Sequence, residues 1–274
     1  MGGTFQRLVN QGHDVHVAYQ TSGNIAVGDE EVIRYLSVFK HLIREYDPDN
    51  KAALDKLSSI LHHLFHEKGS DDVDIPEVRF LKGRIRREEA RSADRYVGLP
   101  HSHVHFLDLP FYETGKVKKD PISEKDVVIV KNFIESIKPH QIYVAGDLAD
   151  PHGTHKVCLD AILDAIDLMK DDDWFKDCRI WMHRGAWMEW EIDHIEMAVP
   201  ISPEELRQKR NAILRHQSQM ESAPFLGDDE RLFWQRSEER NRATANMYDK
   251  LGLASYEAIE AFVEYKPLRD NIEG

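Results

Sequence analysis

The run from Asp147 to His155 holds the side chains best suited to chemistry. It reads Asp-Leu-Ala-Asp-Pro-His-Gly-Thr-His and follows an apolar strand predicted over 141–145. This position favours function, because open α/β sheets place their sites at the carboxyl ends of strands. His152 and His155 are three residues apart at the start of a predicted helix, so both imidazoles can face the same way. Such a pair could hold a divalent metal, or one imidazole could bind metal while the other acts as an acid or electrophile. The alternative is that both histidines only cap and decorate the helix.

Hydrophobic periodicity and turn residues predict the elements that position this loop. We expect helices over residues 1–10, 30–46, 52–66, 76–97, 123–137 and 155–170, and another that begins after Ser202. We expect strands over residues 13–21, 103–109, 141–145, 179–190 and 191–199, followed by a polar helical tail over 229–265.

The order of the first two elements is unusual for an α/β domain. A helix over residues 1–10 precedes the strand over 13–21, whereas an opening helix normally returns from a first strand near the middle of the sheet. We therefore expect a Rossmann-like three-layer α/β sandwich with a mostly parallel sheet, a missing first strand and a helical carboxyl-terminal tail. Residues 1–274 are expected to be a single domain that is truncated at its amino end. Unpaired parallel strands would promote self-association into homo-oligomers.

Composition excludes several classes of partner. The formal net charge of −13 repels polyphosphate, and no basic cluster offsets it, so we expect no nucleic-acid binding. No apolar run approaches the roughly 18–20 residues that a membrane span requires, and no signal segment opens the chain. Cys158 and Cys178 form no CxxC pair or disulfide framework. We expect a cytoplasmic protein.

Three further stretches carry a family resemblance. These are Gly2-Gly3-Thr4, Arg86-Arg87-Glu88-Glu89-Ala90 and the run from Ala212 to Gln219. Together with the loop that ends at His155, they resemble the LmbE/PIG-L family of zinc-dependent N-acetylglucosaminyl deacetylases.

The resemblance implies a zinc cofactor and a role for each site residue. It implies that His155 binds zinc, that His152 stabilises the oxyanion or protonates the leaving amine, and that Asp150 supports the histidines. Arg86 is implied to hold the sugar or its phosphate. The alternative for Arg86 is a solvated helix face with surface ion pairs.

The stretches 109–115, 146–155 and 184–190 resemble a narrower group. That group is the LmbE-like domain that follows a glucosamine-6-phosphate deaminase-like domain in longer bacterial proteins. The resemblance implies an amino-sugar or sugar-phosphate ligand and an amino-terminal deaminase-like domain as a partner in the parent chain.

Departures from the family pattern bear on activity. The PHPDD-type motif, which gives the family further metal ligands and a general base, is absent. Thr154 replaces an aspartate, and Phe111-Tyr112 stands where Asp-Gly is common. Zinc amide hydrolysis needs about three protein ligands and a carboxylate base. We therefore expect weak zinc binding and no deacetylase activity from the chain as given.

Two alternatives to a zinc hydrolase follow from these departures. One is a non-catalytic domain that binds a sugar phosphate or a partner subunit. The other is an accessory part of a protein whose separate deaminase/isomerase domain converts glucosamine 6-phosphate.

Other clusters have two interpretations each. His101, His103 and His105 alternate, so one strand face could present them to a metal, but we favour an exposed strand face. Trp181, Trp187 and Trp190 could line a sugar pocket or pack in the core. His216 is expected to pack or cap rather than react.

Overall fold

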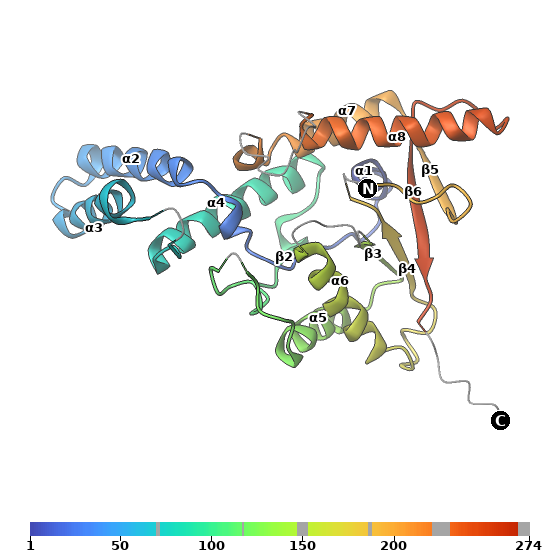
Figure 1. Ribbon diagram of the computed structural model, residues 1–274, viewed down its shortest axis with the longest axis horizontal. Coiled ribbons are helices and arrows are strands. Elements are labelled where there is room, and N and C mark those ends of the chain that lie inside the picture. Colours follow the sequence, from blue (N-terminus) through green and yellow to red (C-terminus); the bar gives the residue numbers. More distant parts are fainter. Residues whose placement is uncertain (70–71, 117, 147–152, 186–187, 221–230, 268–274) are drawn as a thin grey trace.

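A computed structural model describes residues 1–69, 72–116, 118–146, 153–185, 188–220 and 231–267. Within these ranges the chain forms eight α-helices and six strands (Figure 1). The helices are α1 (Gly2–Asn10), α2 (Asp29–Tyr46), α3 (Lys51–His62), α4 (Pro76–Tyr96), α5 (Glu124–Ile137), α6 (Thr154–Asp167), α7 (Pro203–Ile213) and α8 (Phe233–Lys250). The strands are β1 (Val17–Tyr19), β2 (Val104–Phe106), β3 (Gln141–Ala145), β4 (Arg179–His183), β5 (Met197–Ile201) and β6 (Ala258–Tyr265).

The described strands form two separate sheets. One is the parallel pair β1-β2, and the other has the order β3-β4-β6-β5. β3 pairs with β4 in parallel, whereas β6 runs antiparallel to both β4 and β5. A mixed α/β fold is confirmed, but the expectation of a mostly parallel Rossmann-like sheet is not borne out by these pairings.

The polar helical tail expected over 229–265 is wrong in its second half. α8 ends at Lys250, and the chain then returns as β6 between β4 and β5. Residues 258–262 are all buried, so this strand has no exposed face to produce an alternating pattern. The sequence Ala-Ile-Glu-Ala-Phe-Val-Glu-Tyr instead contains good helix formers, which is why it resembled a continued helix.

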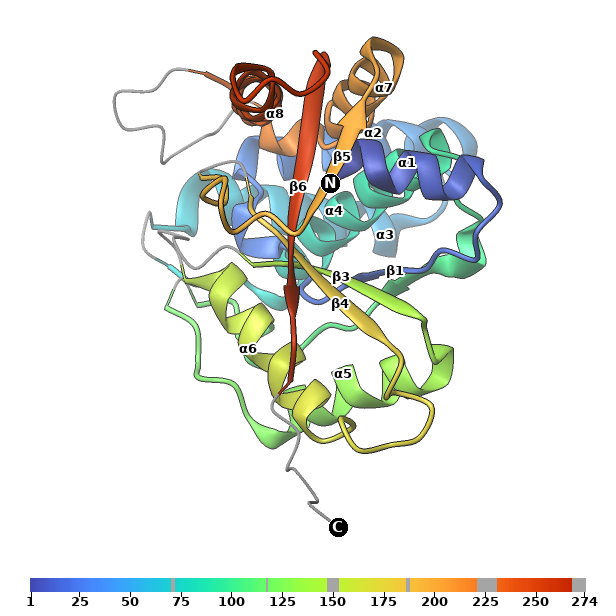
Figure 2. The same cartoon turned by 90° about the vertical axis from the view of Figure 1, so that its right-hand side faces the viewer.

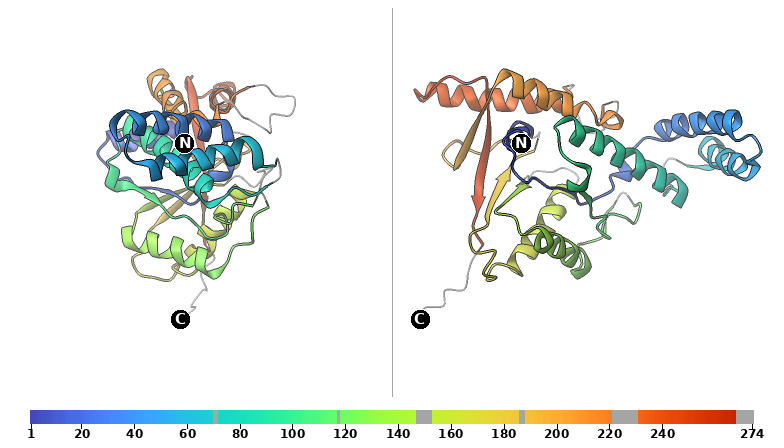
Figure 3. Two further views of the ribbon diagram at one scale, coloured as in Figure 1. Left: turned by 90° about the vertical axis from the view of Figure 1, so that its left-hand side faces the viewer. Right: turned by 180° about the vertical axis from the view of Figure 1, so that it is seen from behind.

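The helices lie in two groups about the larger sheet. α5 and α6 pack together on one side, while α7 and α8 lie on the other (Figure 2). The main core fills the space between α5, α6 and the parallel strands, with Ile134, Val144, Ile166 and Phe175 among its buried members. α2 and α3 form a hairpin that extends away from this body (Figure 3). No described helix is both long and apolar enough to cross a bilayer.

The α5–α6 layer contacts both sheets. The ring of His105 in β2 lies 4.8 Å from that of Phe133 in α5, and Gln20 after β1 donates a hydrogen bond to the carbonyl of Cys158 in α6. Among the described residues, β1 pairs only with β2 and β3 only with β4, so each keeps one edge without a strand partner. The missing first strand near the middle of the sheet stays a prediction.

A buried carboxylate anchors the first helix. Glu260 of β6, 2 % exposed, accepts hydrogen bonds from the backbone amides of Gly3 (3.1 Å) and Thr4 (2.8 Å) at the start of α1. Lys209 of α7 donates to Glu260 (2.9 Å) and to Asn241 of α8 (2.5 Å). Burial alone would raise the pKa of Glu260, but the Lys209 ammonium and the α1 amides hold that pKa well below its usual range.

We predict that Lys209→Met lowers the free energy of unfolding by about 3–5 kcal/mol, because it leaves Glu260 buried without the Lys209 ammonium, which is nearer to it than the Met1 amino group. Urea unfolding at pH 7 measures this loss. The matched control is Lys176→Met, whose side chain is half exposed and pairs with an exposed aspartate. Equal stabilities of the two variants would contradict the role given to Lys209.

Acid titration tests the same cluster. The pKa of Glu260 is lower in the folded chain than in the unfolded one, so its contribution is complete above about pH 4–5, the unfolded range. That contribution is lost as the pH falls toward the folded pKa, because the unfolded state binds the proton first. We therefore expect the stability difference between the native chain and Glu260→Gln to shrink as the pH falls below 4, measured by unfolding at several pH values.

Candidate substrate-binding site

Two cavities open at the carboxyl ends of β1 and β2. The larger has a volume of about 330 Å³ and lies between Ser22, Asn24 and the side of α4 that carries Arg79 and Arg84. The smaller, about 130 Å³, lies directly beyond the strand ends. It is lined by Tyr19, Gln20, Thr21, Ser22, Gly23, Arg86, Arg87, Ala90, Phe106 and His216.

Arg86 lies in the wall of the smaller cavity. Its Nη1 donates to Glu89 one turn along α4 (2.9 Å), and Glu89 in turn accepts from the backbone and hydroxyl of Ser218 (2.6 and 2.8 Å). The Arg86 Nε is buried and has no hydrogen-bond partner among the described residues. Because an unsatisfied buried donor costs about 1–3 kcal/mol, this atom is suited to a ligand oxygen. The Arg86 side chain is 22 % exposed and pairs with Glu89, and its role as a substrate contact stays a prediction.

His216 lines the same cavity. Its Nδ1 is also buried without a described partner. Burial, with a smaller contribution from the nearby Arg86 charge, lowers the pKa of His216 to about 4. His216 is therefore neutral at pH 7, and its ring offers one donor and one acceptor to a ligand.

Carboxylates hold the loop after β1 against the cavity. Glu113 accepts hydrogen bonds from the backbone and hydroxyl of Ser22 (both 3.0 Å) and from the Asn24 amide (3.2 Å). Gly23 lies between them with φ +68°, a left-handed conformation, and a Cβ there would approach Arg86 Nε to 3.0 Å. A glycine at this position thus lets the loop pass close to the guanidinium.

A second carboxyl lies behind the cavity wall. The hydroxyl of Tyr19 donates to both oxygens of Asp94 (3.2 and 3.1 Å), and Asp94 is 2 % exposed. Burial raises the pKa of Asp94 to about 6, with the Tyr19 hydrogen bond acting in the opposite direction. Sequence analysis gave no signal for Asp94, because it reads as one more charge on a polar helix.

The predicted metal and acid–base residues are only partly described. His152 and Asp150 lie outside the described residues. His155 is the second residue of α6 and is exposed. The hydrogen bond from Gln20 to the Cys158 carbonyl, one turn further along α6, places the start of this helix near the end of β1. His155 and Arg86 are thus on elements that converge at the same end of β1.

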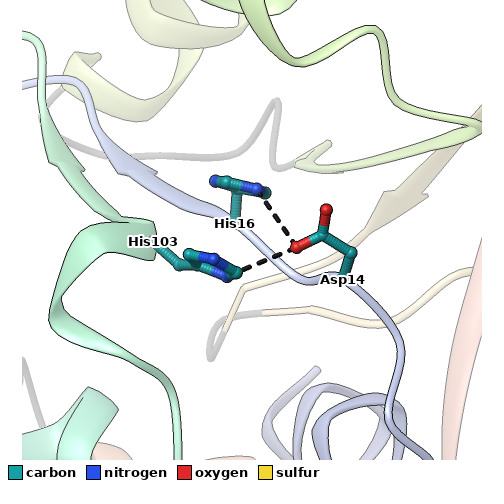
Figure 4. Close-up of side chains that lie close together, drawn as sticks. All are labelled: Asp14, His16 and His103. Atoms are coloured by element: carbon teal, nitrogen blue, oxygen red, sulfur yellow. Dashed lines mark ion pairs between the residues drawn. The ribbon is translucent and has the colours of Figure 1, made fainter.

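A potential metal-binding group of three side chains occurs elsewhere. Within the described ranges, the one such group whose ligand atoms all lie within 4.8 Å of one another is Asp14, His16 and His103 (Figure 4). It precedes β1 and β2, at the end opposite the cavities. The expected zinc site around His155 therefore lacks a complete set of ligands among the described residues.

The alternating histidines do not share a strand face as expected. His101 and His103 belong to a 3₁₀ turn, and only His105 lies in β2. The tryptophan cluster is largely structural in the described part: Trp181 is buried, and Trp190 donates its Nε1–H to the carbonyl of Met182 (3.1 Å). Trp187 lies outside the described residues. Phe111 and Tyr112 are buried in the main core.

Comparison with solved structures shows the fold class. N,N′-diacetylchitobiose deacetylase from Pyrococcus horikoshii is similar over 97% of this chain and 78% of that chain, with a TM-score of 0.54 and 15% identity. GalB, the 4-carboxy-2-hydroxymuconate hydratase from Pseudomonas putida, is similar over 99% and 92%, with a TM-score of 0.56 and 14% identity. The two enzymes carry out different reactions, so this likeness shows the LmbE-like fold alone.

Sequence comparison shows the family. Residues 1–166 match the model of the PIG-L family, described as GlcNAc-PI de-N-acetylase, and the chain belongs to that family. A glucosamine-6-phosphate deaminase-like protein of Bacteroides thetaiotaomicron is 63% identical over 270 residues. That match covers 98% of this chain but only 41% of the relative's length.

We predict that Arg86→Met raises the pKa of His216, because it removes a positive charge that disfavours protonation of the ring. The rise should be partial, since burial is the larger cause and remains. NMR titration of the histidine ring protons measures it, with the exposed Arg95→Met on the same helix as the matched control. A His216 pKa that is the same in both variants would show that the two side chains do not share the cavity.

Proposed function

We propose that this chain is the amino-sugar-binding part of a deacetylase-type hydrolase that removes the acyl group from an N-acetylglucosamine-like sugar. The observation that carries the proposal is the cavity at the ends of β1 and β2. Arg86 and His216 line it, and Arg86 Nε and His216 Nδ1 have no hydrogen-bond partner in the described part of the chain. A sugar presents hydroxyl and amide groups that can satisfy both atoms. Membership of the PIG-L family supports the reaction class.

Arg86 is proposed to hold the sugar or its phosphate. Glu89 already fixes one nitrogen of the guanidinium, which limits the rotamer freedom that binding must remove. Arg79, Arg84 and Arg87 line the adjoining larger cavity together with Glu113 and with Asp108, which pairs with Arg87, so this lining carries a small excess of positive charge. This local charge contrasts with the overall charge of −13 and favours a phosphorylated amino sugar as the ligand.

We further propose zinc as the metal, with His155 as one ligand. When bound in such a site, zinc polarises an amide carbonyl and lowers the pKa of a water molecule. Roles for His152 in stabilising the oxyanion or protonating the amine, and for Asp150 in supporting the histidines, are proposals that fall outside the described residues. The remaining ligands are proposed to come from residues of the longer parent protein.

The second candidate function is a non-catalytic sugar-phosphate-binding or accessory domain. It is favoured by Thr154 at a position where the family resemblance implies an aspartate. It is also favoured by the relative, which is named for a glucosamine-6-phosphate deaminase and is much longer than this chain. In that case the cavity would bind the sugar phosphate while the reaction occurs in another domain.

Binding of N-acetylglucosamine 6-phosphate tests the shared part of both functions. We predict that Arg86→Met weakens binding by about 10- to 100-fold, the effect of losing a charge-assisted hydrogen bond. Isothermal titration calorimetry measures the affinity, and Arg95→Met should bind like the native chain. Equal affinities of the native chain and Arg86→Met would contradict the proposal that this cavity binds the sugar phosphate.

Zinc content and acetate release separate the two functions. We predict that a version extended at its amino end by the parent sequence holds one more zinc than this chain and releases acetate from N-acetylated sugars, and that His155→Ala removes both properties. Elemental analysis and an acetate assay measure the outcome. An extended chain that gains neither zinc nor activity would favour the binding domain.

A further inference from the structure

The segments that lead into β1 and β2 bring three metal-ligating side chains together. Asp14 Oδ1 lies 3.3 Å from His16 Nε2 and 3.4 Å from His103 Nδ1 (Figure 4). Two of these side chains come from the segment before β1 and the third from the turn before β2. The parallel register, which pairs Val17 with Val104, holds the two segments side by side.

These separations match those between ligands of one tetrahedral ion. Nitrogen and oxygen ligands lie about 2.0–2.2 Å from zinc, so two of them in a tetrahedron stand roughly 3.3–3.6 Å apart. Both oxygen–nitrogen distances fall at this value. Two imidazoles and one carboxylate are a ligand set that zinc accepts, and three protein ligands leave a fourth position for water.

The surroundings support a metal as well. His16 Nδ1, the ring nitrogen that faces away from Asp14, lies 3.0 Å from His105 Nε2. A metal-bound imidazole commonly uses its second nitrogen in such a hydrogen bond, which fixes the tautomer and the ring orientation. The His103 ring stacks on His16 with centroids 4.2 Å apart and planes 13° from parallel, so binding one ion in both ring planes would require one ring to tilt. Metal binding at His103 Nδ1 would replace its hydrogen bond to the Val15 carbonyl.

Solvent can deliver the ion. The Asp14 side chain is 78 % exposed, whereas His16 and His103 are 17 % and 28 % exposed. The carboxylate thus lies at the mouth of the group with the imidazoles behind it. The group lies at the amino ends of β1 and β2, and the Arg86 cavity lies at their carboxyl ends, so the two sites are distinct.

We propose that Asp14, His16 and His103 bind a zinc ion that joins the amino ends of β1 and β2. The β1-β2 sheet has three residue pairs, and a two-stranded sheet of this size is marginal by itself. A shared ion would link two segments that are far apart in the sequence, one before β1 with His16 and one before β2 with His103. Its role is therefore structural, and it is independent of the proposed deacetylase function.

Zinc titration of the metal-free chain tests the proposal. Calorimetry should show a site that is lost in His16→Ala and in His103→Ala but retained in His101→Ala, which removes an exposed histidine of the same turn. His155→Ala should also retain this site, which distinguishes it from the proposed catalytic metal. His105→Phe should weaken zinc binding by about 10- to 100-fold, the usual effect of losing an outer-shell partner.

Asp14→Asn provides a test of zinc binding in a variant that is expected to fold normally. Asp14 is largely exposed, so this substitution should leave the circular dichroism spectrum unchanged while it weakens zinc binding. In the native chain zinc should raise the melting temperature, because it binds the folded state, and this rise should be smaller in Asp14→Asn. Zinc affinity that is unchanged in folded Asp14→Asn, His16→Ala and His103→Ala would overturn the proposal.

Discussion

The buried contact between Glu260 and the start of α1 is the constraint on which the rest of the architecture depends. A carboxylate in this position satisfies amides at the helix N-terminus and meets the positive end of the helix dipole. Burying it is tolerable only with a cation beside it, and Lys209 supplies that charge from α7 while it also binds Asn241 of α8. One charged group therefore fixes α1, α7 and α8 on β6. Since α1 leads directly into β1, the same contact sets where the carboxyl end of β1 lies.

The position of β1 determines where the cavity lined by Arg86 and His216 lies. Glu113 and Glu89 then act as two further fixed points, one holding the loop after β1 at Ser22 and the other holding Arg86 against Ser218. Both carboxylates are occupied by these contacts, whereas Arg86 Nε and His216 Nδ1 have no hydrogen-bond partner among the residues that the structure describes. A guanidinium and a neutral imidazole can bind and orient an oxygen-rich molecule. A base for hydrolysis would have to come from another group, and the family resemblance assigns that role to residues absent from this chain.

The sequence was most informative where structure is local. Helical periodicity and capping residues predicted α2, α4 and α5 closely, because contacts within a few residues determine them. It was least informative for β6, which is buried on both faces and carries Glu260 inside the core. Arg86 and His216 both lie in stretches that resemble the family, but 130 positions separate them, so no local pattern indicates that they line the same cavity. The same applies to Asp14 and His16, which meet His103 only through the pairing of β1 with β2.

The short β1-β2 sheet is thus the element through which fold and function meet. Its three residue pairs give few backbone hydrogen bonds, yet the cavity needs the ends of both strands at fixed positions. Beyond the strands, the amides of Leu107 and Leu109 donate to the carbonyls of Tyr19 and Gln20 (both 2.9 Å) and continue the pairing toward the cavity. At the other end, the side chains of Asp14, His16 and His103 are the main link between the segments. A short pair of strands that must hold a binding site rigid is stabilised most usefully by a cross-link at the end that the ligand does not occupy.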